Sequence, residues 1–372
     1  MELSYWEYKT WLSDVDFTVI GSGIVGLNCA LHLKEKHPNC KVLILEKGVL
    51  PQGASTKNAG FACFGSISEL LSDLEKHTEE EVFGLVKKRW QGIQLTRQLL
   101  GDKTIGFHQH GGHELFLNND VALYERCLEG IDGLNNLLAP IFGEKPFQKT
   151  TNFFGFETIY DTFITQTFEA QLNTGMLMNG LLKKALDLGI HILNAVEVIE
   201  FNDSNAKVSI HTDAFSFKSK KVFVATNGFA AKLLKNEAVL PARAQVLVTK
   251  PIKELKVKGT FHLDEGYYYF RNIDDRILLG GGRNLDLKTE ETTEFGQTER
   301  IQNKLEELLQ TVISPNQKVE VEHRWSGIMG VGMQKTPIVK PISNNVYCGV
   351  RLGGMGVALG SLIGKELAEL AD

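Results

Sequence analysis

The chain contains few cysteines, and their arrangement excludes two kinds of scaffold. The cysteines are five, an odd number, at wide spacings and with no Cys-x-x-Cys pair: Cys29, Cys40, Cys63, Cys127 and Cys348. Disulfide frameworks and structural zinc sites need cysteines paired at short, regular spacings. We therefore expect reduced thiols and a cytoplasmic location.

Long apolar runs and charge of one sign are also scarce. No run of about 18 apolar residues occurs, so we expect no membrane span. Residues Met1–Asp14 lack the basic start and apolar stretch of a secretory signal. The net charge of -5 over 372 residues is mild, with no basic stripe or acidic tail, so nucleic acid and membrane surfaces are not expected partners.

A strand, a glycine-rich turn, a helix and a second strand are predicted near the start. The apolar run Asp16–Ile20 is followed by Gly21-Ser22-Gly23-Ile24-Val25-Gly26 and by Leu27–Lys36, whose apolar residues have helical spacing. A second β-rich run, Lys41–Leu45, ends at Glu46. This pattern predicts one βαβ unit that binds a dinucleotide.

The three glycines have separate roles in such a unit. Gly21 allows the tight turn, Gly23 lets the backbone approach a pyrophosphate, and Gly26 lets helix and strand pack closely. Glu46, 20 residues after Gly26, is placed to accept hydrogen bonds from ribose hydroxyls and would repel a 2′-phosphate, which disfavours NADP. The fingerprint does not by itself separate FAD from NAD.

The second half of the chain contains elements of another kind. Antiparallel strands are predicted at Pro241–Lys250, Gly266–Arg271 and Arg276–Gly280, whereas parallel-type elements lie at the beginning, middle and end of the chain. A helical stretch is expected over Glu69–Leu100 and a strand at Glu114–Leu117. The order predicts two interleaved domains in an α/β fold.

Five later segments carry a family resemblance. They are Gly53–Gly60 (GASTKNAG), Val222–Gly228 (VFVATNG), Arg276–Arg283 (RILLGGGR), Trp325–Gly327 with Thr336-Pro337, and Gly353–Ala358 (GGMGVA). In this order the chain resembles the D-amino-acid oxidase superfamily of FAD proteins, which includes glycine oxidase and sarcosine oxidase. The closing segments look most like the gamma-glutamylputrescine oxidoreductases, and the matches run from about residue 16 to residue 370.

The resemblance implies FAD and two domains. It assigns residues 1–75, 164–240 and 326–372 to a Rossmann-like FAD-binding domain. Residues 76–163 and 241–325 form an α+β substrate domain with a mixed, largely antiparallel sheet. The helix that begins at Gly354–Val357 would direct its N-terminus at the pyrimidine edge of the flavin, where the reduced form carries negative charge. An NAD-linked dehydrogenase is disfavoured by these C-terminal segments.

We expect a long set of residues to bind FAD. These are Gly21, Ser22, Gly23, Ile24, Val25, Gly26, Glu46, Lys47, Ser55, Thr56, Asn58, Ala59, Gly60, Val196, Ala225, Thr226, Gly228, Gly327, Gly353, Gly354, Met355, Gly356 and Val357. Some relatives attach the flavin through a histidine in the first Gly-rich segment or a cysteine after the tryptophan. Here Lys57 and Asn58 stand in the first region and Gly330–Met333 in the second, so non-covalent FAD is expected.

The resemblance also implies a reaction. A neutral primary or secondary amine, or an amino acid, gives a hydride from its α-carbon to flavin N5, and the resulting imine is hydrolysed. The acceptor of the electrons is O2 or another molecule; Leu278 stands where sarcosine oxidase has a lysine that serves oxygen activation. The alternative is a flavin-binding module without amine turnover, which has a binding or regulatory role.

A missing arginine bears on the substrate. Glycine oxidase holds the substrate carboxylate with an arginine in a W-x-G-x-R-P pattern, and here that position is Met329. A thioether does not pair with a carboxylate, so another cation takes over or the substrate is an amine without one. The candidate cations are Arg271, Arg283, Arg324 and Arg351, of which Arg351 is the first choice.

Two aromatic and histidine clusters remain. On the strand at Tyr267–Arg271, alternation places Tyr267, Tyr269 and Arg271 on one face, and Tyr269 and Arg271 are candidate pocket residues. Core packing is the alternative for at least two of the four aromatic residues. His108, His110 and His113 invite a metal site, but no further ligand completes a set, so no metal is expected and one of them is a candidate for the pocket.

Overall fold

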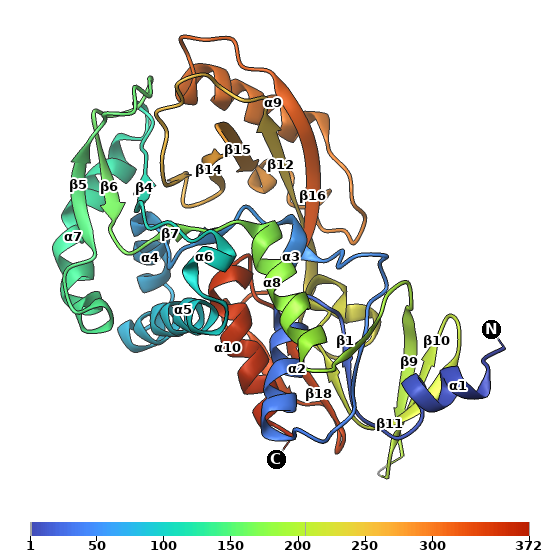
Figure 1. Cartoon of the computed structure of the whole chain (residues 1–372). Helices are drawn as coiled ribbons and strands as arrows, with labels where there is room; N and C mark the ends of the chain where they lie inside the picture. Colours follow the sequence, from blue (N-terminus) through green and yellow to red (C-terminus); the bar gives the residue numbers. More distant parts are fainter. Residues whose placement is uncertain (1, 205, 372) are drawn as a thin grey trace.

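Two eight-stranded sheets form the framework of the molecule (Figure 1). The structure is a computed structural model that describes residues 2–204 and 206–371. Within these residues, no helix is both long and apolar enough to cross a membrane. The five cysteines are free thiols.

The first sheet is built on the predicted βαβ unit. Its main path runs β17-β18-β11-β1-β2-β8; in addition, β10 pairs with β11, and β9 pairs with β10. The strands are β1 (Val15–Ile20), β2 (Val42–Leu45), β8 (His191–Leu193), β9 (Val198–Asp203), β10 (Val208–Thr212), β11 (Ser216–Val224), β17 (Ile338–Pro341) and β18 (Val346–Val350). The pairs from β8 through β18 along this path are parallel, so their carboxyl ends meet at one edge.

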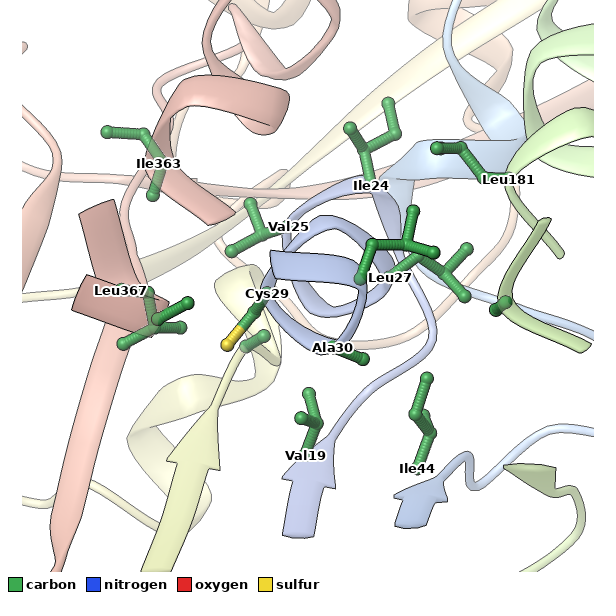
Figure 2. Packing of buried hydrophobic residues seen from close by; sticks show 14 of the residues in the cluster. Val19, Ile24, Val25, Leu27, Cys29, Ala30, Ile44, Leu181, Ile363 and Leu367 are labelled. Carbon is green, nitrogen blue, oxygen red and sulfur yellow. The ribbon is translucent and has the colours of Figure 1, made fainter. Parts of the chain in front are cut away.

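Three helices cover this sheet: α2 (Ile24–Lys36), α8 (Thr174–Asp187) and α10 (Gly356–Glu369). Figure 2 shows α2 at the centre, with Val19 and Ile44 of the strands on one side, Leu181 of α8 on another, and Ile363 and Leu367 of α10 on a third. Helices α2 and α10 approach closely because Gly364 has no side chain: a Cβ there would lie 2.6 Å from the carbonyl oxygen of Val25. The α10 N-terminus is thereby held beside the glycine-rich turn.

The second sheet is mixed and largely antiparallel, and it runs β16-β12-β15-β14-β13-β4-β6-β5. Its strands are β4 (Gly112–Glu114), β5 (Phe147–Thr151), β6 (Thr162–Gln166), β12 (Leu240–Thr249), β13 (Thr260–Leu263), β14 (Tyr268–Ile273), β15 (Arg276–Gly281) and β16 (Val321–Val331). Only the β13–β4 pair is parallel among these described strands. Helix α9 (Glu299–Leu308) packs on the outer face through Ile301 and Leu305. The predicted fold class is confirmed.

The remaining elements are short connections and two long helices. They are α1 (Tyr5–Glu7), α3 (Ala54–Lys57), α4 (Ile67–Leu74), α5 (Glu79–Leu100), α6 (Asp102–Ile105), α7 (Val121–Phe142) and the small pair β3 (Phe61–Ala62) and β7 (Ala170–Gln171). The single helical stretch predicted over Glu69–Leu100 is wrong. Instead, α4 ends at Leu74 and a new helix begins after Thr78. The Thr78 side chain accepts a hydrogen bond from the Glu81 amide, and the Glu81 side chain accepts one from the Thr78 amide. The strand predicted at Glu114–Leu117 lies earlier, as β4.

Helix α5 packs along α10. Its Thr96 hydroxyl lies 2.6 Å from the hydroxyl of Ser361 on α10, and Gly92 lies so close to α10 that a Cβ would overlap the Ala358 carbonyl. The predicted domain boundaries assign α5 to the substrate domain. Its main packing partner, α10, belongs to the segments assigned to the FAD-binding domain. The domain boundaries at residues 75, 163, 240 and 325 stay a prediction.

Candidate active site

A cavity of about 440 Å³ lies where the two sheets meet. Its wall has contributions from the turn before α2, from residues 54–63, from β12 to β16, and from residues 352–358 at the start of α10. Segments that are far apart in the sequence, and that the family resemblance assigned to cofactor and substrate, therefore share one space.

The glycine-rich turn explains two of the predicted glycines by crowding. A Cβ at Gly26 would overlap the carbonyl oxygen of Gly21, and one at Gly21, where φ is 103°, would lie 2.9 Å from the Ala225 oxygen. At Gly23 the neighbour is the Ser55 hydroxyl, which accepts the amide hydrogen of Ile24 at 2.9 Å. Ser55 thus occupies the first free amide of α2, at the helix end that favours anions.

Glu46 is fixed at the end of β2. It is buried, and its Oε2 accepts hydrogen bonds from the Ser22 amide at 3.1 Å and the Ser22 hydroxyl at 2.8 Å. Its Oε1 accepts the amide of Gly48 at 3.0 Å. Because each carboxylate oxygen has two lone pairs, the group keeps acceptor capacity for ribose hydroxyls. Val196 lies beside it and donates its amide to the Glu46 carbonyl.

Residues 54–60 form a turn that Asn58 holds together. The Asn58 side chain donates to the Ser55 carbonyl at 2.7 Å and accepts the amide of Gly60 at 2.8 Å. Arg271 fastens the same turn, since its guanidinium donates to the carbonyls of Gly60 at 3.0 Å and Leu172 at 2.7 Å. Burial lowers the pKa of Arg271 to about 10. Arg271 lies outside the cavity lining, so the structure does not place this candidate in the pocket.

The last glycine-rich turn lines the cavity and begins α10. Gly353 and Gly354 have φ angles of 58° and 84°, and the Met329 sulfur would lie 3.4 Å from a Cβ at Gly354. Arg351, at the entry to this turn, donates its guanidinium hydrogens to the carbonyls of Thr336 and Ala238. It is 8% exposed and lies outside the cavity lining. Arg351, the cation that the sequence favoured as a substrate ligand, thus stabilises the turn, because its N–H groups donate to backbone carbonyls.

The substrate-side wall is aromatic. Tyr269 lies across Gly280, where a Cβ would be 2.8 Å from its hydroxyl oxygen, and its ring is 5.6 Å from that of Phe61 in an edge-to-face contact. Burial raises the pKa of Tyr269 to about 12, so the phenol keeps its proton. Tyr268 and Phe270, on the other face, belong to the core of the second sheet, as the alternation predicted.

A buried polar cluster, which the sequence did not predict, extends the same wall. His262 lies opposite Tyr269 on one side and Glu114 on the other in the strand register. Its Nε2 is 3.3 Å from Oε2 of Glu169, a fully buried carboxylate. Glu114 accepts the amide of Ser68 at 3.0 Å. No local motif marks His262, because its partners are distant in sequence.

Charged side chains gather at another part of the lining. Lys335 lies 2.9 Å from Glu69 and 2.7 Å from Asp73, and Arg89 lies 3.4 Å from Glu69. Burial opposes ionisation of Glu69, but Arg89 and Lys335 lower its pKa to about 2. Arg283 also lines the cavity; among the described residues its guanidinium has no hydrogen bond or ion pair, and no other arginine lines this space.

The three predicted histidines lie elsewhere. His113 is buried on β4, with Nδ1 2.8 Å from the Thr165 hydroxyl, and burial lowers its pKa to about 4. The rings of His108 and His110 stack 5.7 Å apart. None of the three lines the cavity, and His262 does instead. In the part of the chain that the structure describes, no group of three or more potential ligands could hold a metal.

The predicted FAD set divides into two parts. The cavity is lined by Gly23, Ile24, Val25, Ser55, Asn58, Ala59, Ala225, Gly327, Gly353, Gly354, Met355, Gly356 and Val357. Behind or beside this lining lie Gly21, Ser22, Gly26, Glu46, Lys47, Thr56, Gly60, Val196, Thr226 and Gly228. Asn227, which the prediction omitted, lines the cavity and accepts the amide of Arg351 at 3.1 Å.

These features fit a bound dinucleotide. Positions where a Cβ would block the turn are glycines, a helix N-terminus faces the cavity, and a buried carboxylate stands at the end of β2. Fold and site together define a dinucleotide-binding protein. The family model described as "FAD dependent oxidoreductase" matches residues 16–370, so the chain belongs to that family, and FAD is its cofactor.

Individual relatives agree with this family. The chain is 24% identical to a "Probable oxidoreductase OrdL" of Haemophilus influenzae, over 97% of this chain and 83% of the relative. It is 24% identical to the "Gamma-glutamylputrescine oxidoreductase" of Escherichia coli, over 95% and 83%. The fold is similar to that of glycine oxidase from Geobacillus kaustophilus, with a TM-score of 0.76, 17% identity and coverage of 95% and 94%.

Proposed function

We propose that this enzyme oxidises an amine at the carbon next to nitrogen. The observation that carries the proposal is the shared cavity, in which the FAD-binding turns at Gly23 and Gly354 face the aromatic and polar wall at Tyr269 and His262. The chain is similar to a gamma-glutamylputrescine oxidoreductase and to a glycine oxidase. Both of these proteins are named after a substrate that carries an amine.

FAD, when bound, supplies the hydride acceptor of the reaction. The chain supplies the surroundings. The α10 N-terminus favours negative charge at the residue 353–357 turn. Tyr269 and Phe61 restrict the orientation of the substrate, and Tyr269 is a neutral hydrogen-bond donor. The apolar wall of Val246 and Met329 limits the access of water.

A substrate carboxylate, where the amine has one, is held by Arg283 in this proposal. Of the four candidate arginines, Arg271 and Arg351 donate to backbone carbonyls, and Arg324 pairs with Glu306. Arg283 keeps its donors available on the cavity wall. Because Met329 replaces the arginine of glycine oxidase, the carboxylate would bind at a different place in the pocket.

The electron acceptor in this proposal is a molecule other than O2. Leu278, at the position of the oxygen-activating lysine of sarcosine oxidase, is buried against Val246 and Val248. An apolar side chain provides no positive charge to stabilise reduced oxygen species. Non-covalent FAD is part of the proposal as well, since Cys63, the thiol on the cavity wall, has a pKa well above its ordinary value because of burial.

An anaerobic amine screen tests the proposal. The yellow protein is mixed with glycine, L-proline, putrescine and gamma-glutamylputrescine, and flavin absorbance is followed before and after air is admitted. We expect at least one amine to bleach the flavin and air to restore the colour slowly. If no amine of any class bleaches it, the protein is a flavin-binding module without amine turnover; if air restores it at once, it is an oxidase.

A further inference from the structure

His262 is the ionisable side chain that connects the buried polar cluster with the cavity. Its ring lines the cavity wall and is 8% exposed. Phe61 packs edge-on against it at 5.4 Å, and Tyr269 is its neighbour across the strand pair. The ring is therefore held in one orientation on the substrate side.

Glu169 fixes the ring from behind. Its Oε2 lies 3.3 Å from His262 Nε2, and its Oε1 accepts the backbone amide of Phe64 at 2.8 Å. The carboxylate lies against Gly112, where a Cβ would overlap Oε2. Gly112 leaves space for this carboxylate, and the Phe64 amide orients it. The carboxylate is therefore held in position as the hydrogen-bond partner of the imidazole.

The second ring nitrogen has no partner in the described part of the chain. Within residues 2–204 and 206–371, Nδ1 of His262 has no hydrogen-bond partner, whereas Nε2 faces Glu169. In a neutral imidazole one nitrogen donates and the other accepts. When Nε2 carries the hydrogen that points to Glu169, Nδ1 has a lone pair that can accept a proton.

We propose that His262, oriented by Glu169, removes the proton from the substrate ammonium before hydride transfer. This proposal rests on the proposed function, because only the neutral amine can release a hydride from its carbon. The N–H bond of the ammonium breaks, its electron pair stays on the nitrogen, and the proton forms a bond with Nδ1. No electrons are transferred in this step; Glu169 balances the imidazolium, which later gives the proton to water.

The charges around His262 are consistent with this role. Burial disfavours the imidazolium, but the hydrogen bond and charge of Glu169, with Glu114 and Glu69 farther away, raise the pKa of His262 above its ordinary value. Two further ionisable groups lie nearby: His113, whose lowered pKa keeps it neutral at pH 7, and Tyr269, whose raised pKa keeps its phenol protonated. An alkyl ammonium has a pKa of about 10.4, as lysine has. A more basic histidine therefore reduces the difference in pKa between the proton donor and the proton acceptor.

The test compares His262→Gln with the parent enzyme at two pH values. The measured quantity is the anaerobic rate of flavin bleaching by the most reactive amine of the screen. General base catalysis contributes about 100-fold or more, so we expect about a 100-fold loss at pH 7. Near pH 10, close to the ammonium pKa, a substantial fraction of the amine is neutral in solution, so the loss should shrink to a few-fold. An equal loss at both pH values would overturn the proposal.

Two further variants separate chemistry from structure. Glu169→Gln keeps the size of the side chain, and we expect it to shift the acidic limb of the rate profile to lower pH, because the imidazolium loses its counter-charge. The matched control is His113→Gln, a buried histidine on the adjacent strand, which should leave the pH profile unchanged. A limb that stays in place in Glu169→Gln, or moves in His113→Gln, contradicts the assignment.

A second readout covers the case in which His262→Gln does not fold. The histidine signals of the FAD-loaded protein are titrated by NMR in the parent and in Glu169→Gln. One histidine should titrate above its ordinary pKa of about 6.5 and move down in the variant; if none does, the pair is not coupled and the proposal fails. If the parent flavin is bleached by no amine, the proposed function itself fails, whatever the titration shows.

Discussion

The two sides of the cavity are built in different ways. The wall that we propose to hold FAD consists of backbone: tight turns at Gly21–Gly26 and Gly353–Gly354, and the start of α10. The wall that we propose to hold the substrate consists of side chains on β13 to β16, among them Tyr269, His262 and Met329. The turns bind a cofactor that is the same whatever the substrate is. The side chains of the opposite wall can differ with the substrate while the backbone turns stay the same.

The largest effect that separates the two sides is expected from Gly26→Val. The new side chain overlaps the Gly21 carbonyl, so the turn has to open. We expect a loss of about 3 kcal/mol in the free energy of unfolding, together with the loss of bound FAD. Flavin absorbance and urea denaturation measure both. The control is Gly53→Ala, at a position where no atom lies within 4 Å of the new Cβ; if it loses FAD equally, crowding is not the cause.

A change on the substrate side should leave FAD bound. Arg283→Ala removes a charged donor worth about 1.5–3 kcal/mol, so KM for a carboxylate-bearing amine should rise about 10- to 100-fold with FAD content unchanged. An amine without a carboxylate should be affected much less. Arg351→Lys is the comparison: it should lower the thermal stability and leave the preference between the two amines unaltered. A preference that follows Arg351 would reverse the assignment.

The ion pairs of Lys335 predict a pH dependence. The pKa of Glu69 is lowered from its ordinary 4.5 to about 2, so its contribution to stability is complete above about pH 4.5 and is lost as the pH falls towards 2. In Lys335→Met this pKa should rise, and the stability should change less over that pH window. Urea unfolding at pH 7 and pH 3 measures the difference. A steeper dependence in the variant than in the parent would show that Lys335 does not lower this pKa.

The smallest effect is expected away from both sides. Thr78→Ala removes the cap of α5, and we expect a loss of about 1 kcal/mol with FAD content and amine preference unchanged. Thermal unfolding and flavin absorbance check this. A loss of flavin in this variant would mean that α5, through its contact with α10, takes part in cofactor binding.

The sequence predicted the glycine-rich turn and the position of Glu46 because their signals are local. Glycines at fixed spacing between a strand and a helix identify the turn, and Glu46 follows at the end of the second strand. The break before α5 was also present in the sequence, since Thr78 and Glu81 form a capping box that the helical pattern concealed. These features depend on neighbours a few residues away.

The substrate side could not be predicted in the same way. His262 and Glu169 are 93 residues apart, and only the pairing of β4, β6 and β13 brings them together. Arg271 and Arg351 are residues of a type that often binds ligands. In the structure, Arg271 donates to the carbonyls of Gly60 and Leu172, and Arg351 donates to those of Thr336 and Ala238. A sequence does not indicate whether a guanidinium meets a ligand or a turn.

The central claim is that one cavity holds FAD on its backbone side and the amine on its side-chain side. The most direct measurement is a crystal structure of the yellow protein with a bound amine or its unreactive analogue. The account predicts the flavin ring between residues 353–357 and the Tyr269–His262 wall, with the amine nitrogen within hydrogen-bonding reach of His262. A flavin ring outside this cavity, or an amine bound on the far side of the sheet, would contradict it.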